Sequence, residues 1–267
     1  MLGKLMKYEI KATGRTLIPL YIALLAFAII NKIFIGTGLA DKLEGFGSIP
    51  FILSIFGYGC AMAAVFIVTF FVIIQRFYKN ILGDEGYLMN TLPVTTITNV
   101  TSKISIATFW NIVSGFVAIL SIIIMAFNPD TFGKFFLEIF QSLSESYAEL
   151  GVQIYIIIIE VIIAILIYLV KSVTMIYASI SIGHLFSKHR ILSSFGAFIV
   201  LNLITTAISS TLGIAFSHSN LASIFHNITS SLPVHLFLGS LILLNLVFFI
   251  AYFVITNYIL KNKLNLE

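Results

Sequence analysis

One carboxylate lies within the most apolar part of the chain. Glu160 interrupts the run "YIIIIEVIIAILIYLV" and is the only acidic residue between Val152 and Tyr177. A carboxylate in hydrocarbon is costly, so such a residue usually faces the interior of a helix bundle or a water-filled cavity. Two interpretations stay open. Glu160 either belongs to a substrate pathway or conformational switch, or is a protonated or hydrogen-bonded carboxyl that packs against Ser, Thr or Asn of a neighbouring helix.

The sequence offers few other groups for catalysis or for metal binding. It contains no G-x-x-x-x-G-K-[ST] phosphate loop and no H-E-x-x-H motif, and no nucleophile has an evident base beside it. His218 and His226 could form a metal pair, but two solvated loop side chains are the simpler interpretation. We therefore predict no enzymatic activity, no metal, no cofactor and no nucleic-acid partner. Any work driven by ATP would require another chain.

The composition places these residues in a membrane protein. Of the 267 residues, 59% are hydrophobic and only 10% are charged, and the mean hydropathy is +1.07. Because about 20 apolar residues cross about 30 Å of hydrocarbon, the long apolar runs predict membrane-spanning helices. We expect an all-α polytopic protein with a single membrane domain, 1–267. The six expected spans are 16–35, 50–74, 97–127, 152–177, 191–216 and 234–260.

The basic residues set the expected orientation of these spans. With the N-terminus inside, twelve Lys and Arg residues fall in cytoplasmic segments and three fall in outer segments. Cytoplasmic loops of membrane proteins carry an excess of these residues. Both termini are therefore expected in the cytoplasm.

Two amphipathic segments accompany the spans. Basic residues recur every three or four positions in residues 1–15, which predicts a helix lying along an anionic cytoplasmic membrane surface. This helix is either a membrane anchor alone or also contacts a partner. Residues 130–150 carry aromatic residues at helical spacing, and predict an outer interfacial helix or an extension of the fourth span. The basic residues of the first segment are Lys4, Lys7, Lys11 and Arg15.

Small and polar residues are concentrated in the second and fifth spans. Small residues let membrane helices approach closely, and hydroxyl groups can bond across a helix interface. The same residues can also line a translocation pathway, so both interpretations are kept. The candidate pathway or interface residues are Gly57, Gly59, Asn202, Thr205 and Ser209, together with Glu160.

A polar hairpin, "RFYKNILGDEGYLMNTLP", separates the second and third spans and is expected in the cytoplasm. Asp84 is a suitable N-cap, and Glu85 suits the positive end of a short helix. Gly83 and Gly86 would permit the sharp turn and a close approach, because glycine accepts a positive φ without a steric penalty. The short helix would expose polar side chains that could dock into another protein.

The third span should begin directly after this hairpin. Thr95 or Thr96 can cap that helix, since both carry a hydroxyl that accepts a bond from a backbone N–H one turn later.

The hairpin also carries a family resemblance. "RFYKNILGDEGYLMNTLPV" resembles the pattern "RFYKNLLGDEGYLMFTLPV" of bacterial ABC-2 type permeases, with Asn90 at a position that is often aromatic. The opening "MLGKLMKYEIKATGR" is similar to theirs, and the six-span layout fits the whole chain. The resemblance implies an elbow helix at 1–15 and a coupling segment at 78–96. The implied coupling residues are Gly83, Asp84, Glu85, Gly86 and Tyr87.

The resemblance further implies function, partners and location. It indicates a multi-pass permease of the bacterial plasma membrane that exports a peptide, lipid or other amphipathic substrate. The partners would be a separate ATPase subunit that holds ATP and Mg²⁺, a second permease copy or paralogue, and membrane lipid. Two alternatives are an ion-coupled secondary transporter and a membrane scaffold or sensor that transports nothing.

Overall fold

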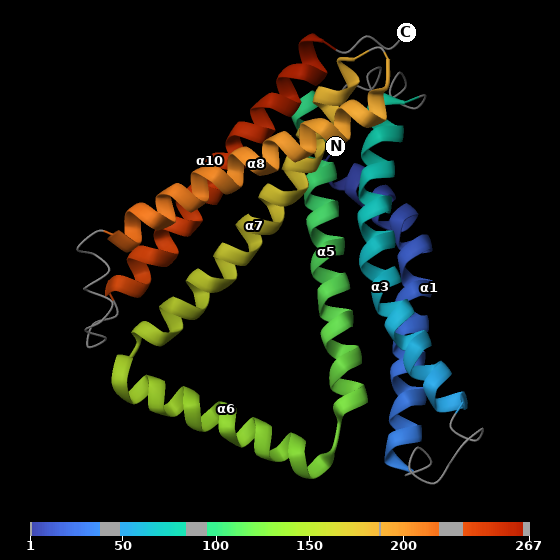
Figure 1. Ribbon diagram of the computed structural model, residues 1–267, viewed down its shortest axis with the longest axis vertical. Helices are drawn as coiled ribbons and strands as arrows, with labels where there is room; N and C mark the ends of the chain where they lie inside the picture. Colours follow the sequence, from blue (N-terminus) through green and yellow to red (C-terminus); the bar gives the residue numbers. More distant parts are fainter. Residues whose placement is uncertain (1, 38–48, 84–94, 187, 219–231, 264–267) are drawn as a thin grey trace. The chain divides into compact units, whose positions relative to one another are not determined.

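The computed structural model describes residues 2–37, 49–83, 95–186, 188–218 and 232–263 (Figure 1). These residues form seven α-helices and one π-helical turn and contain no strand, which confirms the all-α prediction. The elements are α1 (Leu2–Gly36), α3 (Ile49–Phe77), η2 (Tyr78–Leu82), α5 (Thr96–Ala126), α6 (Pro129–Leu150), α7 (Gln153–His184), α8 (Arg190–His218) and α10 (Leu232–Asn262).

Six of these helices are long and apolar enough to cross a membrane, which confirms the six expected spans. The membrane-spanning segments have between 25 and 34 residues and mean hydropathies from 2.0 to 2.7. A helix rises 1.5 Å per residue, so each exceeds the thickness of the hydrocarbon core. Thr95 caps the third of them, because its Oγ1 accepts a hydrogen bond from the Thr98 amide at 3.3 Å.

The amphipathic segment at residues 130–150 is a separate helix rather than an extension of the fourth span. α6 ends at Leu150, and Gly151 follows with a φ of 58°. A residue in this left-handed conformation commonly ends a helix, and glycine adopts it without steric cost. The Gly151 amide donates to the Tyr147 carbonyl at 2.8 Å, which closes the last turn.

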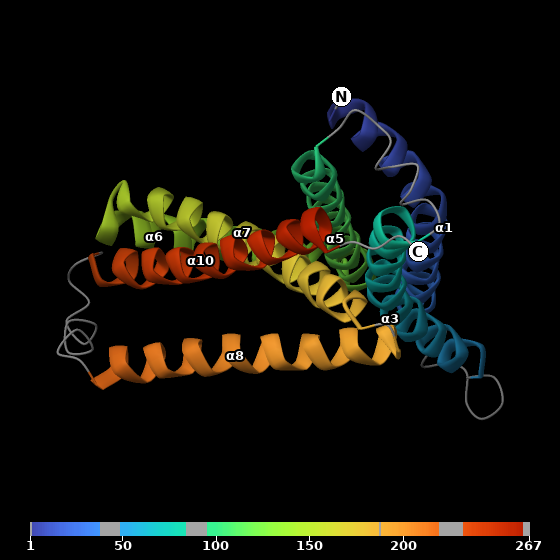
Figure 2. The ribbon, with the colours of Figure 1, turned by 90° about the horizontal axis from the view of Figure 1, so that it is seen from above.

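The basic N-terminal segment is continuous with the first span. α1 runs from Leu2 to Gly36 with Pro19 inside it, and Figures 1 and 2 show its first turns angled to the remainder. Proline has no N–H for the carbonyl four residues earlier and commonly kinks a helix. The bend therefore takes the place of the expected break between the elbow and the span.

Contacts divide the chain into two compact units. The first comprises Met1–Arg76 and Phe109–Ile139, and the second comprises Phe77–Thr108 and Phe140–Glu267. The boundaries fall inside α3, α5 and α6. The expected single membrane domain stays a prediction.

Hydroxyl groups connect α1, α3 and α5 within the first unit. Ser114 on α5 bonds to the Tyr21 hydroxyl of α1 at 2.8 Å and to the Thr69 hydroxyl of α3 at 2.9 Å. All three side chains are buried. Membrane helices often associate through such bonds and through small residues, so Thr69 has a packing role here.

In the second unit, α7 packs against both α8 and α10. Its core contains Met175 and Ala178 of α7 with Phe248 and Tyr252 of α10. The Tyr252 hydroxyl also bonds to the hydroxyl of Thr205 on α8. Figure 1 shows α7 and α10 side by side and running in the same direction.

The orientation of the spans can be tested by labelling. Single cysteines at Lys7, Lys79 and Lys188, introduced in a Cys60→Ala background, should be shielded from an impermeant thiol reagent in intact cells. A cysteine at Glu145 should react. The four labelled positions are exposed in the described structure, so burial within the chain does not limit the reaction. Cys60 is also exposed and would react if it were kept. Labelling at Lys79 from outside would reverse the map.

Candidate functional site

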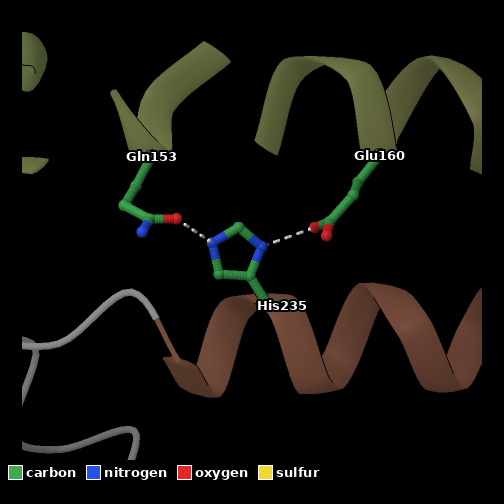
Figure 3. Close-up of polar contacts among 3 residues, drawn as sticks. All are labelled: Gln153, Glu160 and His235. Carbon is green, nitrogen blue, oxygen red and sulfur yellow. Dashed lines mark hydrogen bonds and ion pairs between the residues drawn. The ribbon is translucent and has the colours of Figure 1, made fainter. Parts of the chain in front are cut away.

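Three polar side chains meet between the first turns of α7 and α10 (Figure 3). The His235 Nδ1 atom lies 2.8 Å from Glu160 Oε2, and its Nε2 atom lies 3.0 Å from Gln153 Oε1. The side chains of His235 and Glu160 are 20% and 25% exposed, respectively. The imidazole thus joins a carboxylate and an amide of α7 to α10, inside segments long enough to span a membrane.

This cluster is complete in either charge state of His235. Glu160 and Gln153 both present oxygen atoms, which suits an imidazolium that donates from both ring nitrogens. Rotation of the Gln153 amide would present its NH₂ group instead and suit the neutral ring. Each ring nitrogen of His235 therefore has a hydrogen-bond partner in both arrangements.

The structure gives Glu160 a partner that neither interpretation named. The packing interpretation placed Ser, Thr or Asn beside it, whereas the structure supplies His235, which the sequence reasoning did not single out. Two signals could have identified the cluster. Gln153 and Glu160 are seven residues apart, which is two helical turns on one face of α7. His235 lies at the corresponding end of the sixth span, which runs in the same direction as the fourth.

If the chain is a transporter and Glu160 lines its pathway, Glu160→Gln should lower transport while leaving assembly intact, whereas a carboxyl that only packs should tolerate the change. Glutamine keeps the size and one hydrogen bond to His235 but loses the charge-assisted part of the contact. Interhelical hydrogen bonds in membranes contribute about 0.6 kcal/mol on average, so the fold should tolerate the change. Transport into inverted vesicles and gel filtration of the purified protein measure the two effects.

The control is Glu138→Gln, which removes an exposed carboxylate from α6. A normal transport rate with Glu160→Gln would remove Glu160 from the functional residues.

Of the expected coupling residues, only Gly83 lies within the described residues. Asp84, Glu85, Gly86 and Tyr87 lie outside them. Gly83 has a φ of −96°, so the positive φ expected for it is wrong. Crowding explains the glycine instead, since a Cβ at this position would lie 3.2 Å from the Lys79 carbonyl oxygen.

The segment that leads to Gly83 is firmly anchored on α7. The rings of Phe77 and Tyr177 stack with centroids 3.9 Å apart and an interplanar angle of 9°. Both side chains are buried, with 0% and 1% of their surface exposed. The Tyr177 hydroxyl donates to the Lys103 carbonyl of α5 at 3.4 Å. A displacement of η2 would therefore act on both α7 and α5.

The basic residues of the elbow are exposed wherever their side chains are described. In the elbow, Lys7, Lys11 and Arg15 are exposed, while the side chain of Lys4 lies outside the description. Their contact with a membrane stays a prediction.

The small residues of the second span differ from each other. A Cβ on Gly57 would lie 2.7 Å from the Phe27 ring. A Cβ on Gly59 would have no described atom within 4 Å beyond its chain neighbours and its own helix backbone. Gly57 therefore serves the packing of α3 on α1.

The polar residues of the fifth span also separate. Thr205 is buried and bonds to α10, while Asn202 is exposed and Ser209 is half-buried on α8. A packing role is evident for Thr205. For Asn202 and Ser209, packing and pathway both stay open.

Comparison with known proteins supplies no relative. No protein-family model matches the chain, and neither a curated protein nor a solved structure matches it.

Proposed function

We propose that the chain is the membrane-spanning permease subunit of an ATP-driven ABC transporter of the ABC-2 type. The observation that carries this proposal is the segment "RFYKNILGDEGYLMNTLPV", which resembles the coupling segment of such permeases and connects α3 to α5. Six helices that can span a membrane agree with the layout of this family. The proposed cargo is a peptide, a lipid or another amphipathic molecule, and the proposed direction is export.

The packing around η2 supports a mechanical role for this segment. A force applied by an ATPase at the cytoplasmic hairpin would pass through η2 to the stacked rings of Phe77 and Tyr177. Tyr177 belongs to α7, which is connected to α10 by the His235–Glu160 contact. π-helical turns occur frequently at functional sites. ATP binding would favour one arrangement of these helices, and hydrolysis would release it.

An ion-coupled secondary transporter is the second candidate, because the structure brings two ionisable side chains together within spanning segments. Proton relays in transporters are built from intramembrane carboxylates and histidines. This function predicts transport without an ATPase and a requirement for Glu160 and His235.

ATP hydrolysis in liposomes separates these candidates. The chain would be reconstituted with an ATPase that co-purifies with it, and hydrolysis would be followed with amphipathic peptides and lipids as trial cargoes. Stimulation by a cargo supports the ABC permease. Transport driven by a proton gradient without ATP supports the secondary transporter. A complex that binds the ATPase without either activity would favour a scaffold.

A further inference from the structure

A basic cavity opens at the beginning of α8, within the second unit. It is an open groove with a volume of about 720 Å³. Figures 1 and 2 show that α8 begins where α7 ends, and both helices can span a membrane. Lipid headgroups lie just outside the hydrocarbon, so this cavity is within their reach. The lining residues are Tyr78, His189, Arg190, Ile191, Leu192 and Phe195.

One side of the cavity favours a negative charge. Lys188, His189 and Arg190 are consecutive, and the last two line the cavity. No acidic side chain lines it in the part of the chain that the structure describes. The tyrosine ring of Tyr78 packs edge to face on His184, with centroids 6.4 Å apart, and so holds η2 at the cavity.

The other side of the cavity is apolar and largely uncovered. Ile191, Leu192 and Phe195 are 84%, 68% and 62% exposed, respectively. A small free anion would contact only the basic side and leave these side chains uncovered. An amphipathic molecule with an anionic head would satisfy both sides, because its acyl chains would cover the apolar residues.

We propose that this cavity binds an anionic phospholipid. The phosphate lies against Arg190, and the acyl chains follow Ile191 and Phe195 along α8. Basic pockets at the ends of membrane helices recognise such headgroups through charge and hydrogen bonds. The proposal concerns lipid binding alone and does not depend on ATP-driven transport.

A local fluorescence reporter tests the proposal. The full chain with Trp110→Phe and Ile199→Trp would carry its only tryptophan one turn beyond Phe195 on α8. Trp110 Nε1 makes no hydrogen bond among the described residues, so its replacement by phenylalanine loses none. Vesicles of phosphatidylcholine would contain a small fraction of brominated phosphatidylglycerol or, in the parallel series, brominated phosphatidylcholine.

Quenching by the brominated phosphatidylglycerol should exceed quenching by the brominated phosphatidylcholine. Arg190→Gln should lower this preference about fivefold, the factor that corresponds to about 1 kcal/mol per basic residue near an anionic surface. Lys261→Gln, which removes an exposed charge from the end of α10, should retain it. Ile191→Glu adds a repelling charge at an exposed position and provides a second variant if Arg190→Gln does not fold.

Three results would overturn the proposal. An unchanged preference in Arg190→Gln or, if that variant does not fold, in Ile191→Glu would show that the cavity does not select the lipid. An equal loss in Lys261→Gln would indicate general surface charge rather than a site. Abolition of the preference by inorganic phosphate, at ionic strength matched with chloride, would assign the cavity to free phosphate instead of a lipid.

Discussion

Gly183→Ala is expected to destabilise the packing of α8 on α7. A Cβ built on Gly183 would lie 2.5 Å from the Ser194 Cα and closer still to the amide nitrogen and hydroxyl of that residue. Backbone atoms cannot move aside as a flexible side chain can, so the start of α8 must shift. Overpacking of this kind costs about 1–3 kcal/mol and occasionally more. The melting temperature of the purified protein in detergent should fall.

The matched control is Gly196→Ala, in the first turns of α8. A Cβ at Gly196 would have no described atom within 4 Å beyond its chain neighbours and its own helix backbone. Alanine also favours the helix more than glycine does. This variant should melt at the wild-type temperature or above. Equal melting temperatures for Gly183→Ala and Gly196→Ala would contradict the close approach of the two helices.

The double change Asp84→Ala with Glu85→Ala should weaken recruitment of the ATPase or uncouple hydrolysis from transport. The sequence places these two carboxylates at the start of the proposed coupling helix, where basic or polar groups of an ATPase could meet them. Loss of one partner of a buried charged contact costs about 2–5 kcal/mol. The affinity for the ATPase should therefore fall by at least about thirtyfold.

A pull-down with the ATPase and a coupled transport assay measure both effects. Insertion and folding should be unchanged, which the melting temperature monitors. The control is Glu145→Ala with Glu149→Ala, two exposed carboxylates on α6, which should bind and couple as the wild type does. If the Asp84 and Glu85 variant also binds and couples normally, these residues form only a solvated turn.

Much of the fold could be predicted because a membrane imposes a simple rule on sequence. Apolar runs of sufficient length must be helices, since hydrocarbon offers no partner for backbone groups. Helix capping offered Thr95 or Thr96 as the first cap of the third span, and the structure uses Thr95. The continuity of α1 was missed, because the change from a basic stripe to an apolar run suggested two helices. One bent helix accommodates both.

The candidate site was only half predictable. Glu160 was identified because a carboxylate in an apolar run is conspicuous. His235 was missed because it lies near the end of a span, where a polar residue is ordinary, and because its partner is 75 residues away. Pairing of this kind depends on which helices are neighbours, and uniform apolar helices give little indication of that. Gly57 and Gly183 likewise owe their roles to a particular neighbour.

Affinity purification of the tagged chain from its own membranes in mild detergent tests the permease assignment most directly. Mass spectrometry of the complex should detect an ATPase with a G-x-x-x-x-G-K-[ST] motif, in a one-to-one ratio with the chain if the partner permease is a second copy and in a two-to-one ratio if it is a paralogue. The amount of this ATPase should fall when Asp84 and Glu85 are replaced by alanine. Purification of the chain without any such ATPase, together with transport sustained by an ion gradient alone, would contradict the assignment.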